Sequence, residues 1–152
     1  MRRATIADTS LLVTFMAEFY AEGGYELDQD RAREAFEAIL SHESLGAVWI
    51  IQTDGRDAGY LVVAFRFAME FAGTIACLDD LYVRSEFRNR GLASAALFEL
   101  RGFCQAAGIR ALTVEVGFDN GAAQKVYRRA GFTEAANRQL LALALAPPAH
   151  KE

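Results

Sequence analysis

The chain has 152 residues, of which 53% are hydrophobic and 24% are charged, and this composition is typical of one folded domain with a substantial core. The formal net charge of −4 argues against nucleic acid or an anionic membrane surface as the main partner. Asp8 and Glu18 interrupt the N-terminal apolar residues, and no apolar stretch is long enough to cross a bilayer, so we expect a soluble, cytoplasmic protein. Cys77 and Cys104 have apolar neighbours and no metal-ligand spacing, so we expect reduced thiols and no metal site.

The first third of the chain predicts a short strand and two helices. Residues 3–6 fit the strand, and apolar residues recur at helical spacing over residues 9–21, after Asp8 as the N-cap. A second helix is predicted over residues 29–40, capped by Asp28. A flexible, acidic and aromatic segment joins the two helices.

The middle of the chain changes from helical spacing to strand-like alternation. Residues 47–52 and 58–67 are predicted strands, and the dipeptide Asp54-Gly55 between them is a strong signal for a tight hairpin turn. A third strand is predicted over residues 73–83. These three strands form an antiparallel meander that ends in a basic turn.

The last third predicts a βαβ unit followed by a closing pair of strands. A helix follows Gly91 and stops at Gly108, and residues 109–116 form a strand that must run parallel to the one before the helix. A short helix comes next. The closing strands are predicted over residues 132–136 and 139–146.

The fold class that follows is α/β (α+β), with the element order β-α-α-β-β-β-α-β-α-β-β. We expect residues 1–152 to form a single domain, built on a mixed, largely antiparallel sheet of about seven strands with about four helices on its two faces. The last residues, 147–152, contain two prolines and are expected to be a disordered tail.

The basic turn before the third helix has the chemistry of an anion site. The first turn of a helix has backbone N–H groups without partners and a partial positive charge, both of which a phosphate can satisfy. Gly91 lets a bulky ligand approach the main chain, while Arg88 and Arg90 add positive charge. A solvated loop that caps a helix would have the same composition, so the turn alone does not decide the function.

Two separate motifs resemble those of the GNAT superfamily of acetyl-CoA-dependent N-acetyltransferases. The first is Arg88-x-x-Gly91-x-Ala93, which is similar to the family's pyrophosphate-binding signature with alanine in place of its last glycine. The second runs from Asn120 through Ala123 and Tyr127 to Gly131-Phe132 and resembles the family's Asn-x-x-Ala-x-x-x-Tyr…Gly-Phe segment. The predicted order of elements resembles the family as well. The resemblance implies transfer of an acetyl group from acetyl-CoA to a primary amine of a small molecule or peptide, by direct attack in a ternary complex.

The resemblance also assigns cofactor-binding residues. Pantetheine would lie along the end of the third meander strand, at Leu81, Tyr82 and Val83. The pyrophosphate would lie on the turn and the helix start, at Arg88, Asn89, Arg90, Gly91, Leu92, Ala93 and Ser94. Asn120 and Tyr127 are seven residues apart and so share one helix face, where they can address the same ligand.

Acetyl transfer needs a neutral amine, a donor to the developing oxyanion and a proton for the departing thiolate. The resemblance implies that Tyr127 is the general acid for the thiolate. The alternative is that Tyr127 is a core aromatic and that Asn120 only caps its helix.

Asp79 and Asp80 are the candidate bases. Regular alternation places them on opposite faces of the strand, and the resemblance favours Asp79. Relatives often have a bulge near this point, and a bulge would change the parity and bring in Asp80. The competing interpretation is a solvated acidic strand end.

The acceptor side has no transferable motif. Tyr20, Tyr25 and Glu26 are candidate substrate residues that could attract a cation, although exposed acids on a loop often serve only for solvation. A non-catalytic acyl-CoA-binding or regulatory module with the same fold is the alternative to an enzyme. The apolar strand near the C-terminus and the family's habits are compatible with a homodimer.

Overall fold

The computed structural model describes residues 1–135 and 138–151. Four α-helices and seven strands, together with three short 3-10 helices, make up these residues. The elements are β1 (Arg2–Arg3), η1 (Ile6–Asp8), α1 (Thr9–Glu22), β2 (Glu26–Leu27), α2 (Gln29–Ser41), β3 (Gly46–Thr53), β4 (Arg56–Ala68), η2 (Met69–Phe71), β5 (Gly73–Val83), η3 (Ser85–Phe87), α3 (Leu92–Ala106), β6 (Leu112–Val114), α4 (Gly121–Arg129) and β7 (His150–Lys151).

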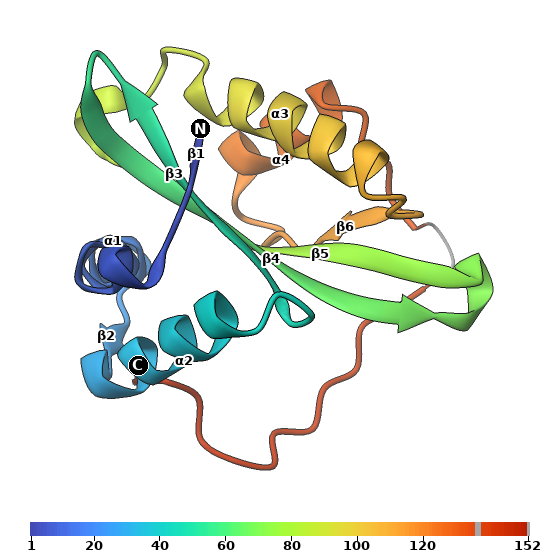
Figure 1. The fold of residues 1–152 in the computed structure, drawn as a ribbon, viewed down its shortest axis with the longest axis horizontal. Helices are drawn as coiled ribbons and strands as arrows, with labels where there is room; N and C mark the ends of the chain where they lie inside the picture. The colour runs from blue at the N-terminus through green and yellow to red at the C-terminus, as the bar shows by residue number, and fades with distance from the viewer. Residues whose placement is uncertain (136–137, 152) are drawn as a thin grey trace.

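A five-stranded sheet in the order β1-β3-β4-β5-β6 forms the centre of the molecule. Its strand pairs are antiparallel except β5 and β6, which are parallel as the βαβ connection requires. Helices α1 and α2 cover one face, and α3 and α4 cover the other (Figure 1). The predicted fold class is therefore confirmed, but the central sheet has five strands instead of about seven, and β2 and β7 form a small second sheet.

Alternating side chains of the sheet build a separate core on each face. Tyr60, Val62 and Tyr82 point toward the α1–α2 pair, where they pack with Phe15 and Phe36. The residues between them on the same strands point to the opposite face and pack against α3. The hairpin between β3 and β4 turns at Asp54-Gly55, both with positive φ (51° and 71°), as predicted from the dipeptide.

An irregularity in β5 determines which of its acids faces which side of the sheet. Val62 pairs with Asp80, but the next residue, Val63, pairs with Leu78, so Asp79 is an extra residue without a partner. This bulge keeps Asp80 on the face of Tyr82, toward α1, and leaves Asp79 exposed.

The pairing between β5 and β6 is short. It covers Ala76, Cys77 and Leu78 of β5, and β6 ends at Val114. From Asp79 to Val83, the edge of β5 therefore has no strand beside it among the described residues. Backbone groups at the end of the central strand are left available to a ligand.

Several predicted boundaries differ from the structure. The first strand is shorter than expected because Ile6 already belongs to a 3-10 helix, whose start at Thr5 is closed by a capping box with Asp8. The predicted strand over residues 109–116 is reduced to β6. The two closing strands are wrong for the described part of their ranges, residues 132–135 and 139–146, which contain no strand; residue 136 lies outside the described residues. An apolar alternation makes a strand only where an edge is available to pair with it.

The C-terminal residues, expected to be a disordered tail, have defined contacts up to Lys151. His150 and Lys151 form β7, which pairs with Leu27 and Glu26 of β2. The guanidinium group of Arg31 donates hydrogen bonds to the carbonyl oxygens of Pro147 and Pro148, at 2.8 and 2.7 Å. Glu152 lies outside the described residues.

Candidate functional site

The turn between β5 and α3 presents main-chain donors. Asn89 and Gly91 have φ values of 58° and 75°, a conformation that non-glycine residues rarely adopt. Gly91 is the N-cap of α3, and no side chain of the described residues caps the helix there. A Cβ atom on Gly91 would meet nothing within 4 Å, so the space over the turn is open. The N–H groups of Leu92, Ala93 and Ser94 therefore face an accessible, electropositive position.

The arginines of this turn already have acidic partners. The guanidinium of Arg88 donates to the carbonyl oxygen of Val83 and to the carboxylate of Glu22, each at 2.7 Å. Arg90 donates to Asp54 at 2.6 Å, on the β3–β4 hairpin. An anion on the turn would thus be bound by the backbone amides first, and the arginines would have to exchange partners to contact it.

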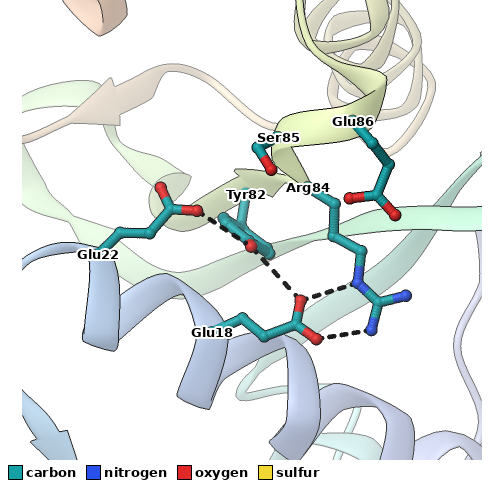
Figure 2. Close-up of a pocket in the computed structure, with 6 residues that line it drawn as sticks. All are labelled: Glu18, Glu22, Tyr82, Arg84, Ser85 and Glu86. Carbon is teal, nitrogen blue, oxygen red and sulfur yellow. Dashed lines mark hydrogen bonds and ion pairs between the residues drawn. The ribbon is translucent and has the colours of Figure 1, made fainter.

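A pocket of about 400 Å³ lies between α1 and the start of this turn. Figure 2 shows its six lining residues, Glu18, Glu22, Tyr82, Arg84, Ser85 and Glu86. Glu18 accepts two hydrogen bonds from Arg84, at 2.8 and 2.7 Å, and this contact lowers the pKa of the glutamate. The phenol of Tyr82 lies 3.4 Å from Glu18 and 3.3 Å from Glu22 and can donate its one hydrogen to either carboxylate. Burial and the acidic neighbours raise the pKa of Tyr82 to about 12. Glu22 and Arg84 are absent from the predicted site, because neither lies in a recognisable motif.

Asp80 is a carboxylic acid whose pKa is raised above its usual range. Its carboxylate accepts a hydrogen bond of 2.6 Å from the phenol of Tyr60, which is fully buried. Burial raises the pKa of Asp80 to about 6; the charge of Asp79 acts in the same direction, while the hydrogen bond from Tyr60 opposes it. An acid with this pKa changes protonation near neutrality, as a general base must.

An aromatic cluster lies beside these acids. The rings of Tyr20 and Tyr25 pack edge to face on His150, with centroid distances of 5.3 and 4.8 Å. Burial raises the pKa of Tyr20 to about 12, and the charges of Asp80 and Asp79 add to the effect. Tyr20 therefore connects the aromatic cluster to the acid pair. Two of the predicted substrate residues belong to this cluster, whereas Glu26 is exposed in β2 and pairs with Lys151.

Helix α4 presents the second predicted motif. The side-chain oxygen of Asn120 accepts a hydrogen bond of 3.1 Å from the N–H of Ala123, so Asn120 does cap the helix. Tyr127 packs edge to face on Phe132 at 5.6 Å. Burial raises the pKa of Tyr127, and the charge of Asp80 adds to this rise. The phenol therefore stays protonated and senses the same carboxylate as Tyr20.

A smaller hollow of about 210 Å³ lies between α3 and α4. It is lined by Ser94, Leu97, Phe98, Arg101, Arg129 and Ala130. It combines apolar side chains with two arginines and lies beyond the N-terminal turn of α3.

Comparison with known proteins identifies the family. Residues 12–132 match the acetyltransferase (GNAT) family. The chain belongs to the GNAT acetyltransferase family. A comparison with curated proteins gives no match.

Solved structures agree with the GNAT assignment. An integron cassette protein from the mobile metagenome of Cole Harbour Salt Marsh is 42% identical, with a TM-score of 0.89, and the match covers 97% of this chain and 91% of that chain. A predicted acetyltransferase with acetyl-CoA from Clostridium acetobutylicum is 20% identical, with a TM-score of 0.78 and coverage of 93% and 94%. The aminoglycoside N-acetyltransferase AAC(6')-Iy in complex with CoA is 19% identical, with a TM-score of 0.79 and coverage of 95% and 93%. The last two share the fold with this chain.

The predicted site residues of this GNAT protein come from several separate segments of the chain. Residues 88–94 and the β5 end at residues 81–83 are contiguous in space, because the strand leads directly into the turn. Tyr127 comes from a separate helix and packs against the core on the α3 face, and the charge of Asp80 adds to the rise in its pKa. The bulge turns Asp79 away. Tyr60 and His150 lie in the site without having been predicted. Tyr60 lies in a strand outside both sequence motifs. His150 lies in the C-terminal tail, for which the sequence predicted no secondary structure.

Proposed function

We propose that this GNAT protein is an N-acetyltransferase that transfers the acetyl group of acetyl-CoA to a primary amine of a small molecule or peptide. The observation that carries the proposal is the position of Asp80. It is an acid with a pKa of about 6 on the α1 face of β5, at the start of a strand edge that no described strand pairs with. That edge leads to the uncapped N-terminus of α3.

The described residues fit the cofactor. The free edge of β5 from Leu81 to Val83 offers backbone groups to the pantetheine amides, and the open space over Gly91 admits a diphosphate to the helix N-terminus. The hollow between α3 and α4, which Arg101 and Arg129 line, would lie against the nucleotide end. Acetyl-CoA would supply a thioester carbonyl at the Asp80 end of this track.

The chain's own groups supply the two proton transfers. Asp80 in its ionised form accepts a proton from the ammonium form of the acceptor, directly or through a water molecule, and leaves a neutral amine. Tyr60 holds the Asp80 carboxylate in one orientation through its hydrogen bond. Tyr127, whose raised pKa keeps it protonated, would give its proton to the leaving sulfur.

The acceptor would approach from the α1 side of the sheet. Tyr20, Tyr25 and His150 form one wall there, and the carboxylate of Asp80 provides negative charge. Aromatic faces and carboxylates together attract an organic cation. A structural neighbour, AAC(6')-Iy, has been solved in complex with the bisubstrate analogue CoA-S-monomethyl-acetylneamine, which supports an amine as the acceptor class. We also propose a cytoplasmic location and a homodimer.

The test is a thiol-release assay with acetyl-CoA and a panel of monoamines, polyamines, aminoglycosides and peptide N-termini. The expected result is CoA release above the rate of hydrolysis with at least one amine, and mass spectrometry of that acceptor shows a gain of one acetyl group. Acetyl-CoA binding measured by calorimetry without turnover of any amine would instead favour the non-catalytic acyl-CoA-binding module. Absence of acetyl-CoA binding would reject both functions.

A further inference from the structure

The side chain of Arg88 is held in one position at the end of β5. Its Nε atom donates a hydrogen bond of 2.7 Å to the carbonyl oxygen of Val83, and its Nη2 atom lies 2.7 Å from both carboxylate oxygens of Glu22. Its Cζ atom lies over the ring of Tyr82, 5.7 Å from the centroid. A planar guanidinium keeps one orientation when its donors contact two different partners. Arg88 therefore bridges the strand end and helix α1.

The bond to Val83 lies on the free edge of β5. In an antiparallel pair, the backbone groups of successive residues point alternately toward and away from the neighbouring strand. The N–H of Arg84 donates to the carbonyl oxygen of Ala58 at 2.9 Å, so the backbone groups of Val83 point away from β4. The pairing of β5 with β6 ends at Leu78. Arg88 therefore occupies one of the backbone groups that we propose for the pantetheine amides.

The carboxylate of Glu22 supplies the charge that holds Arg88 in this position. Glu22 is the last residue of α1, where the helix dipole adds partial negative charge. Figure 2 shows Glu22 reaching from α1 toward Tyr82 at the strand end. The side chains of Arg88 and Glu22 are 40% and 43% exposed. Because water screens an ion pair with this exposure, its partners can be exchanged at a small cost in free energy.

A diphosphate at the N-terminus of α3 would compete with Glu22 for Arg88. Both are anions, and a phosphate group matches the guanidinium fork as well as a carboxylate does. A diphosphate that contacted Arg88 in its present position would lie beside the Glu22 carboxylate, and the two like charges would repel each other. Arg88 therefore has to leave Glu22 and Val83 before one ligand can contact the β5 edge, the turn and the guanidinium together.

We propose that the ion pair between Glu22 and Arg88 is an autoinhibitory latch on the acetyl-CoA site. In the free protein, Glu22 holds Arg88 across the end of β5, and acetyl-CoA binds by drawing Arg88 from Glu22 to its diphosphate. The same exchange uncovers the carbonyl oxygen of Val83 and releases the Glu22 carboxylate into the pocket that it lines. Glu22 thereby lowers the affinity for acetyl-CoA through Arg88, without contacting the cofactor. This inference rests on the acetyl-CoA site of the proposed function.

Calorimetric titration with acetyl-CoA tests the latch in a double-mutant cycle. Glu22→Gln removes the competing carboxylate, so the dissociation constant should fall by about three- to fivefold, the size of an exposed ion pair. In the Arg88→Gln background, the same Glu22→Gln change should alter the dissociation constant by less than about twofold, because there is no guanidinium to release. Glu86→Gln is the charge-matched control, because Glu86 lines the same pocket but pairs with Arg56, at 4.0 Å. Its dissociation constant should stay within about twofold of wild type.

The Nε–H signal of Arg88 in a proton–nitrogen NMR spectrum reports the exchange directly. The signal is assigned by its loss in Arg88→Gln, and its proton should exchange with water more slowly in wild type than in Glu22→Gln. Saturating acetyl-CoA should shift the signal in wild type. Thermal unfolding of each variant within about 4 °C of the wild-type midpoint shows that the fold is kept.

The outcomes separate the latch from the proposed function. Clear acetyl-CoA binding with the same dissociation constant in wild type and Glu22→Gln would overturn the latch and leave the proposed function standing. An equal gain from Glu22→Gln in the presence and absence of Arg88 would also overturn it, because the effect would then be a general change in charge. Failure of both wild type and Glu22→Gln to bind acetyl-CoA would reject the proposed function and the latch together.

Discussion

The two sides of the β5 end are built in different ways. The proposed cofactor side uses consecutive residues, from β5 through Gly91 into α3, and its donors would be mainly backbone amides. The proposed acceptor side is assembled from side chains on separate elements: Tyr20 on α1, Asp80 on β5 and His150 on β7. A backbone site depends on conformation and tolerates many side-chain changes. A site made of side chains loses one interaction with each substitution. Substitutions on the two sides should therefore affect different quantities, either acetyl-CoA affinity or the kcat and KM for the amine.

The largest expected effect is on the acceptor side. Asp80→Asn removes the proposed base and should lower kcat by about 10²- to 10⁴-fold, with the dissociation constant for acetyl-CoA unchanged in calorimetry. Asp79→Asn is the matched control, because Asp79 is exposed and unpaired in the bulge, and its kcat should change less than about threefold. Equal losses in both variants would show that the acid pair, and not Asp80, matters.

The pH dependence follows from the raised pKa of Asp80. The wild-type kcat/KM should rise with pH through about 6, as Asp80 ionises, and the Asp80→Asn variant should lack this limb. Because the folded state binds the Asp80 proton more tightly than the unfolded chain, this group favours folding below about pH 4 and loses that contribution as pH rises to about 6. Urea unfolding of wild type and Asp80→Asn across this window measures the difference.

An intermediate effect is expected on the cofactor side. Gly91→Ala places a Cβ where a diphosphate would approach, and it also strains a residue whose φ is 75°. Acetyl-CoA affinity should fall about tenfold or more, and the free energy of unfolding should fall by about 1–2 kcal/mol. Gly102→Ala is the control, because this glycine lies within α3 with open space around it and should gain slightly in stability. Unchanged acetyl-CoA affinity in Gly91→Ala would place the diphosphate elsewhere.

The smallest effect is expected at the edge of the acceptor pocket. His150→Ala removes one ring of the aromatic wall and should raise KM for the amine by about three- to tenfold, with acetyl-CoA binding unchanged. His42→Ala is the control, because the ring of His42 bonds the carbonyl of Ala38 at the end of α2. A change in acetyl-CoA affinity in His150→Ala would mean that the two sides are not separable.

Local signals in the sequence predicted the parts of the fold that local physics determines. Asp54 and Gly55 adopt the positive φ values that their hairpin turn requires, and Gly91 adopts a positive φ at the N-cap of α3. The fold class and the family motifs followed from such segments. The roles of Tyr127 and of residues 81–94 in binding and catalysis remain predictions.

Non-local pairing explains what the sequence could not reveal. Whether Asp79 or Asp80 faces α1 depends on a register shift between β4 and β5. Because both residues are aspartates, the local sequence does not indicate which of them is the bulge residue. The stretch 139–146 has the composition of a strand, but strand formation depends on an edge, which belongs to another part of the chain or to another chain. His150 reached the site only through the pairing of β7 with β2.

The bulge in β5 also has a mechanical consequence. Before Asp79, the strand is held on both edges, by β4 and β6; after it, only β4 holds the strand. Leu78 and Leu81, three residues apart, still pack into the same core on the α3 face. The strand therefore consists of two segments with different support, and among the described residues the pairing of β5 with β6 ends before the segment that leads to Gly91.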